Sequence, residues 1–84
     1  MTEKEIQILG FAKENIYEYE GEEEPDYYYF LDIVDGITFI TQSRDQVKNG
    51  NWTVDIFNTD PFVRFDKMEK VQSLINTLTN AIVK

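Results

Sequence analysis

The chain has 84 residues, is 42% hydrophobic and carries a formal net charge of −8, which is enough apolar material for one small folded domain over residues 1–84 but not for two. It contains no cysteine and no histidine, so disulfide bonds and the usual ligands of zinc, iron and copper are excluded. The first residues are too polar for a signal peptide and no apolar run is long enough to cross a membrane, so we expect a cytoplasmic protein.

The first predicted element is a short helix over residues 3–9. Thr2 and Glu5 have the spacing of a capping box, in which each side chain bonds the backbone N–H of the other residue. Gly10 follows and favours the left-handed conformation that ends a helix. A helix this short is stable only when it docks on the rest of the protein.

The most distinctive stretch of the chain is residues 14–36. It holds nine of the 16 acidic residues and all five tyrosines, and it contains no lysine or arginine. Alternation of side chains predicts a strand over residues 12–20 and a second strand over residues 26–34. The connection over residues 21–25 contains three successive glutamates, which cannot all be buried. The stretch therefore predicts an acidic, tyrosine-bearing β-hairpin with a solvated tip.

Asp35-Gly36 predicts a two-residue type I′ turn, in which both central residues have positive φ, followed by a strand over residues 37–42. Such a turn places Val34 opposite Ile37 and fixes the register of the two strands. One face of the sheet is then predicted to carry Tyr28, Phe30, Asp32, Val34, Ile37, Phe39 and Thr41. The other face is predicted to carry Tyr27, Tyr29, Leu31, Ile33, Thr38 and Ile40.

Two short strands and a helix complete the chain. Residues 52–57 alternate as a strand, and residues 62–65 are expected to add either a short fifth strand or a bulged continuation. Asp66 and Glu69 have capping-box spacing at the start of a helix that runs to the C-terminus, where Lys84 complements the helix dipole. The apolar stripe of this helix consists of Met68, Val71, Leu74, Ile75, Leu78 and Ile82. The predicted fold class is α+β: a short N-terminal helix, an antiparallel β-meander of four to five strands, and a C-terminal helix packed across one face.

The residue types argue against catalysis and cofactor binding. Without histidine or cysteine, a carboxylate pair is the remaining catalytic candidate, and it requires a cleft that a small meander does not supply. No phosphate-binding loop or calcium-binding loop pattern is present. The basic residues are scattered, so they do not predict a nucleic-acid surface. We expect no enzyme activity, no metal site and no cofactor.

Protein binding is the function that the composition favours. Residues 1–36 carry eleven acidic and two basic side chains, so the negative charge lies in the N-terminal half. Tyrosine is common at interface hot spots, and neighbouring carboxylates attract basic partners. The candidate binding residues are Tyr17, Glu18, Tyr19, Glu20, Glu22, Glu23, Glu24, Asp26, Tyr28 and Asp32.

Two simpler interpretations remain open. The tyrosines at positions 17, 19, 27 and 29 can be half-buried core residues, and the acidic surface can serve solubility alone. Under the binding interpretation, Glu18 and Glu20 lie about 6.6 Å apart on a strand. A row of charges at this interval can stand in for a nucleic-acid backbone.

The pattern as a whole resembles small acidic proteins of phages and prophages. The matching pieces are Leu9-Gly10-Phe11, Tyr27-Tyr28-Tyr29, Gly50-Asn51-Trp52 and residues 74–78. Compact acidic phage proteins of this size include anti-CRISPR inhibitors, several of which mimic nucleic acid. The resemblance implies a target with a basic channel for phosphates, such as an RNA-guided nuclease in the host cytoplasm.

The leading hypothesis is a non-enzymatic acidic inhibitor or adaptor that docks the hairpin on a basic surface of a nucleic-acid-handling protein. The alternative is a phage structural or assembly module that forms a homo-dimer or larger assembly through an apolar face of the sheet.

Overall fold

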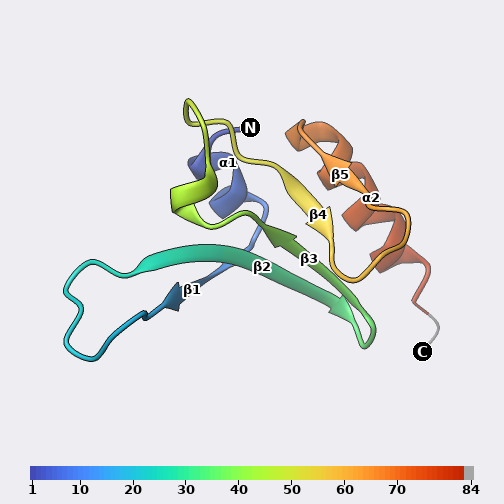
Figure 1. Ribbon diagram of the computed structural model, residues 1–84. Coiled ribbons are helices and arrows are strands. Elements are labelled where there is room, and N and C mark those ends of the chain that lie inside the picture. The colour runs from blue at the N-terminus through green and yellow to red at the C-terminus, as the bar shows by residue number, and fades with distance from the viewer. Residues whose placement is uncertain (83–84) are drawn as a thin grey trace.

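A computed structural model describes residues 1–82 and shows the predicted α+β fold (Figure 1). The predicted place of Lys84 lies outside the described residues. Each strand pairs antiparallel with the next, in the order β1-β2-β3-β4-β5. The elements in chain order are α1 (Glu3–Ile8), β1 (Ala12–Ile16), β2 (Asp26–Val34), β3 (Ile37–Thr41), the 3₁₀ turn η1 (Arg44–Gln46), β4 (Val54–Ile56), β5 (Arg64–Phe65) and α2 (Met68–Asn80).

The capping box of α1 is confirmed. The Glu5 backbone N–H donates to Thr2 Oγ1 over 3.2 Å, and the Thr2 backbone N–H donates to Glu5 Oε1 over 2.8 Å. These bonds satisfy two of the donors that a helix start leaves without partners. The helix docks through Ile6, which is completely buried.

The strand β1 is shorter than predicted, and this corrects one part of the binding hypothesis. It ends at Ile16, opposite Asp26, whereas the alternation predicted a strand to Glu20. Mutual repulsion among the glutamates that follow disfavours a longer flat ladder. Glu18 and Glu20 therefore lie in a loop, and the predicted strand-spaced row of charges does not form.

The turn between β2 and β3 is not of type I′. Gly36 has the predicted positive φ of 92°, but Asp35 is not among the described non-glycine residues with positive φ. A type I′ pair of positive φ values occurs instead at Asn49 and Gly50, with φ of 56° and 69°. There the Asn51 backbone N–H donates to the carbonyl oxygen of Lys48 over 3.0 Å.

A β-bulge changes the predicted faces of the sheet. Val34 lies opposite Ile37 as predicted, but the register shifts between Asp32 and Val34, so that Asp32 pairs with Thr38 and Leu31 pairs with Phe39. Such a bulge adds one residue to one strand and reverses the facing of every residue beyond it. The predicted grouping of faces is therefore wrong for most of β2: Tyr27, Tyr29 and Leu31 share the side of Phe39, and Tyr28 and Phe30 share the opposite side with Thr38 and Ile40.

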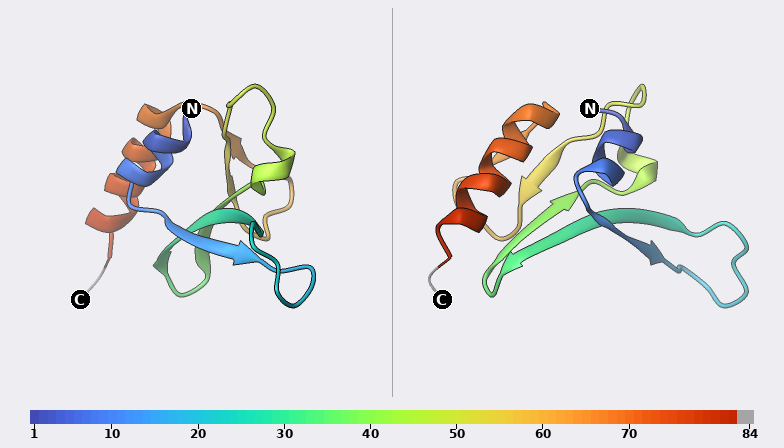
Figure 2. Two further views of the ribbon diagram at one scale, coloured as in Figure 1. Left: turned by 90° about the vertical axis from the view of Figure 1, so that its left-hand side faces the viewer. Right: turned by 180° about the vertical axis from the view of Figure 1, so that it is seen from behind.

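Both helices lie on one side of the sheet (Figure 2), and their buried side chains pack in one core with Tyr29. The core between the helices and the sheet consists of Ile6, Leu9, Phe11, Tyr29, Phe39, Trp52, Val54 and Val71. Burial of these large apolar side chains is the main source of stability for so short a chain. Within residues 1–82, no helix covers the opposite side of the sheet.

The start of α2 differs from the prediction. Its N-cap residue is Lys67, which makes no side-chain capping bond, so the predicted capping box of Asp66 and Glu69 is wrong. The helix begins one residue later than the box requires, and Glu69 then lies at the second helical position rather than the third.

The predicted apolar stripe of α2 faces the core, but to different depths. Val71 is completely buried, whereas Ile75 and Leu78 are half-buried. Ile82 follows the end of the helix and is 40% exposed. Neither helix of residues 1–82 has the length and apolar character needed to cross a membrane.

Candidate protein-binding site

The loop between β1 and β2 projects from the end of the hairpin (Figure 1). We call residues Tyr17–Pro25 the tip loop. Gly21, with φ of 84°, allows the chain to reverse there. The Glu18 backbone N–H donates to Glu22 Oε2 over 3.0 Å, so one glutamate holds the loop rather than facing solvent alone.

The structure divides the four tyrosines at positions 17, 19, 27 and 29 into two pairs. Tyr27 and Tyr29 lie at the core, and Tyr29 is only 2% exposed. Tyr17 and Tyr19 lie in the tip loop and are each 65% exposed. The core interpretation of the tyrosines therefore holds for the first pair and fails for the second.

The two core tyrosines share one carboxylate. The hydroxyl groups of Tyr27 and Tyr29 donate to Glu3 Oε2 over 2.8 and 2.7 Å, and Gln7 Nε2 donates to the Tyr29 hydroxyl over 3.0 Å. Burial, together with the bond to Glu3, raises the pKa of Tyr27 to about 12 and also raises the pKa of Tyr29. The cluster joins α1 to β2 and holds the base of the hairpin.

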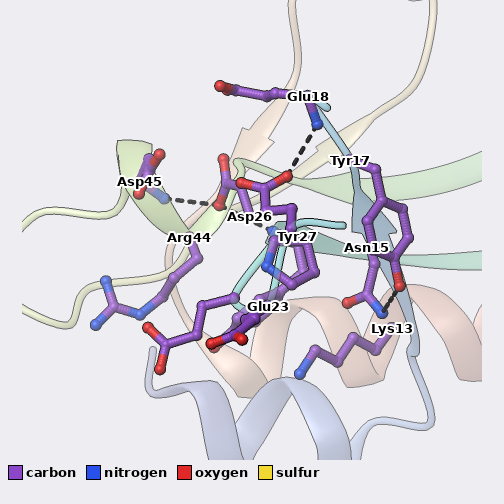
Figure 3. Close-up of a pocket in the computed structure, with 12 residues that line it drawn as sticks. Lys13, Asn15, Tyr17, Glu18, Glu23, Asp26, Tyr27, Arg44 and Asp45 are labelled. Carbon is purple, nitrogen blue, oxygen red and sulfur yellow. Dashed lines mark hydrogen bonds between the residues drawn. The ribbon is translucent and has the colours of Figure 1, made fainter. Parts of the chain in front are cut away.

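A polar pocket of about 740 Å³ lies between the tip loop and η1 (Figure 3). The Asp45 backbone N–H donates to Asp26 Oδ1 over 3.1 Å, which links η1 to the start of β2. The lining carries six carboxylates, those of Glu18, Glu22, Glu23, Glu24, Asp26 and Asp45.

Two cations also line this pocket. Lys13 Nζ lies 3.9 Å from the centre of the Tyr27 ring, a cation–π contact, and Arg44 belongs to η1. In the sequence these two residues are the nearest basic residues on either side of residues 14–36. The fold brings both of them next to the carboxylates of that stretch. The pocket lining therefore contains both acidic and basic side chains, with the acidic ones in excess. The exposed outer part of the tip loop carries acidic side chains without basic ones.

The ten predicted binding residues lie in three places. Seven lie in the tip loop: Tyr17, Glu18, Tyr19, Glu20, Glu22, Glu23 and Glu24. Asp26 begins β2 and accepts the bond from η1, so it is a structural residue of the hairpin base. Tyr28 and Asp32 lie on the side of the sheet that the helices leave uncovered, and Asp32 Oδ1 accepts a bond of 2.6 Å from the Thr38 hydroxyl.

The uncovered side of the sheet carries a groove of about 390 Å³ that sequence reasoning missed. It is lined by Glu14, Tyr28, Phe30, Thr38, Ile40 and Phe57. The predicted register put Ile40 on one face of the sheet and Tyr28 and Phe30 on the other face, because it assumed a ladder without a bulge. The bulge places all three residues on the same face, and no residue type in β2 predicts the bulge.

Among residues 1–82, no group of three or more acidic side chains has an arrangement that could hold a metal ion. A scan against protein-family models, a search of curated proteins and a search of solved structures each found no match to this chain. The tip loop and the groove on the uncovered side of the sheet are the two candidate functional surfaces of residues 1–82.

Proposed function

We propose that this chain is a non-enzymatic protein-binding inhibitor or adaptor that docks its tip loop on a basic protein surface. The observation that carries the proposal is the exposure of Tyr17 and Tyr19, each 65%, in a loop where they contribute nothing to the core. An exposed tyrosine ring offers a large area that a partner can bury, and tyrosine loses little entropy when it is buried in an interface.

The carboxylates around these rings define the chemistry of the partner. Glu18, Glu20, Glu23 and Glu24 are exposed in the tip loop. A negative surface attracts basic surfaces within about 8 Å at physiological salt and speeds their encounter. Proteins that bind nucleic acid carry such basic surfaces, because they contact phosphates through lysine and arginine.

A nucleic-acid-handling protein is therefore the target class that we propose, and the basic channel of an RNA-guided nuclease is one example. On such a target the tip loop would compete with nucleic acid for the same basic surface. Because the glutamates lie in a loop and not along a strand, this competition depends on the density of negative charge. It does not depend on a phosphate-like spacing.

The uncovered groove favours a second candidate function. An assembly module would bury Tyr28, Phe30 and Phe57 against a second copy. The two functions differ in what they predict for salt: an electrostatic complex weakens as salt rises, and apolar self-association does not.

The experiment compares two charge-reversed variants of equal net charge. The tip variant carries Glu20→Lys, Glu23→Lys and Glu24→Lys, all at exposed positions. The control variant carries Asp35→Lys, Asp66→Lys and Glu69→Lys, which are exposed positions outside the tip loop. Each protein is immobilised and used to capture partners from a cell lysate at low and high salt.

We expect the parent and the control variant to retain a basic partner at low salt that the tip variant loses. A further variant with Tyr17→Ala and Tyr19→Ala should lose the same partner without any change of charge. Equal retention by the tip variant and the parent would contradict the proposal.

A further inference from the structure

We propose that the groove on the uncovered side of the sheet receives an apolar side chain that basic residues flank in the partner's sequence. This inference rests on the proposed function and names the second contact of the same partner. The tip loop supplies charge and two exposed tyrosines, and the groove supplies a second, apolar contact.

The groove is built by three neighbouring strands and one residue beyond them. Glu14 comes from β1, Tyr28 and Phe30 from β2, and Thr38 and Ile40 from β3. The rings of Tyr28 and Phe30 lie 6.4 Å apart between centres and both line the groove. A volume of about 390 Å³ matches one or two side chains rather than a whole element.

Phe57 forms the exposed wall of the groove. Its side chain is 59% exposed, although its backbone is held, because the Phe57 N–H donates to the Thr38 carbonyl oxygen over 2.8 Å. A ring that is fixed at its backbone and open on its face is a preorganised contact surface. When a partner buries this ring, apolar area is removed from water and the backbone at Phe57 loses little conformational entropy.

The charges around the groove select a basic partner. Asp55 and Arg64 also lie on this side of the sheet, and they neutralise each other through bonds of 2.8 and 3.2 Å. Two further charged residues on this side are Glu14, which lines the groove, and Asp32 farther along β2. Both are exposed carboxylates, so an apolar residue between arginines or lysines matches the groove in shape and in charge.

The same charges disfavour a second copy of this chain as the occupant. Two copies, each with a net charge of −8, would bring the carboxylates at both grooves together. The groove has six lining residues, whereas a stable protein interface uses about 20–30 residues on each side. A small anchor pocket beside a larger charged contact fits these dimensions better than a dimer interface does.

The strands β1 and β2 connect the two contacts. They contribute three of the six lining residues of the groove, and they also carry the tip loop at their end. A single partner can therefore contact both surfaces along one hairpin.

The test uses two labelled peptides. The apolar peptide has a leucine–phenylalanine pair flanked by arginines, and the serine peptide has two serines in place of that pair. Binding to the parent, to Phe57→Ser and to the tip variant is measured by fluorescence anisotropy. Phe62→Ser is the matched control, because Phe62 is 64% exposed and lies outside the groove lining.

We expect the parent and Phe62→Ser to bind the apolar peptide about tenfold more tightly than the serine peptide. Phe57→Ser should lose this preference, and the tip variant should weaken for both peptides while keeping the preference. In the parent, the amide resonances of Tyr28, Phe30 and Ile40 should shift more with the apolar peptide, which tests the groove even if a variant fails to fold.

Equal affinity of the parent for the two peptides would overturn the inference. So would a parent dimer in analytical ultracentrifugation that Phe57→Ser dissolves, because a second copy would then be the occupant. If the tip variant binds both peptides as the parent does while Phe57→Ser loses the preference, the proposed function fails and the groove assignment stands.

Discussion

At the scale of single residues, Glu3 is the most informative side chain that sequence reasoning missed. Its position in the first turn of the predicted helix gave no sign of a contact with a distant strand. In the structure Glu3 Oε2 accepts bonds from both core tyrosines. The sequence separation of more than twenty residues explains why no local pattern could reveal this contact.

This cluster predicts a loss of stability at alkaline pH. The pKa of Tyr27 is about 12 in the folded protein, against an ordinary value of about 10. The folded state therefore holds the proton more tightly than the unfolded state does. The stabilisation is complete below about pH 10 and is lost as the pH rises through about 12.

The measurement is the urea midpoint of the parent and of Tyr27→Phe across this pH range. The variant lacks the ionisable hydroxyl, so its midpoint should fall less steeply than that of the parent between about pH 10 and 12. Parallel curves for the two proteins would show that Tyr27 does not carry the expected linkage.

At the scale of elements, most helices and strands followed from local patterns. The bounds of β2 were predicted to the residue, because a stretch rich in aromatic and aliphatic residues there ends at the Asp35-Gly36 turn. The end of β1 was predicted wrongly, because the alternation of tyrosine and glutamate continues past Ile16 although pairing with β2 stops there. Alternation describes which face a residue would take, and it does not report whether a partner strand is present.

The bulge in β2 had the largest consequence. It moved Tyr28 and Phe30 to the side of Ile40 and so created the groove. A bulge depends on how two strands fit over the whole sheet, and the residues on either side of it, Asp32 and Val34, carry no signal of it.

The docking of α2 leads to a prediction about stability. Val71 is completely buried, so Val71→Ala should lower the free energy of unfolding by about 1.5–3 kcal/mol. The change removes two methyl groups from the contact between helix and sheet. Chemical denaturation measures it directly.

Ile82→Ala is the control for this prediction. Ile82 is 40% exposed beyond the end of the helix, so its truncation should change the stability by no more than about 0.5 kcal/mol. If the two substitutions had equal effects, the helix would not be docked through Val71.

At the scale of the whole molecule, the distribution of charge followed from the sequence, but its arrangement did not. The excess of acid in residues 1–36 is visible in the composition. Lys13 and Arg44 lie beside the carboxylates of the pocket only in the folded protein, because the fold brings β1 and η1 next to the tip loop. The outer tip loop is left as the most negative surface, with Tyr17 and Tyr19 exposed in it.

Zero-length cross-linking measures whether the tip loop contacts a basic partner. A carbodiimide joins carboxylates to lysines that touch them, and mass spectrometry of the captured complex identifies the joined residues. We predict cross-links from Glu20, Glu23 and Glu24 to partner lysines, and none from Asp35, Asp66 or Glu69, although all six side chains are exposed. Cross-links confined to Asp35, Asp66 and Glu69 would contradict the account.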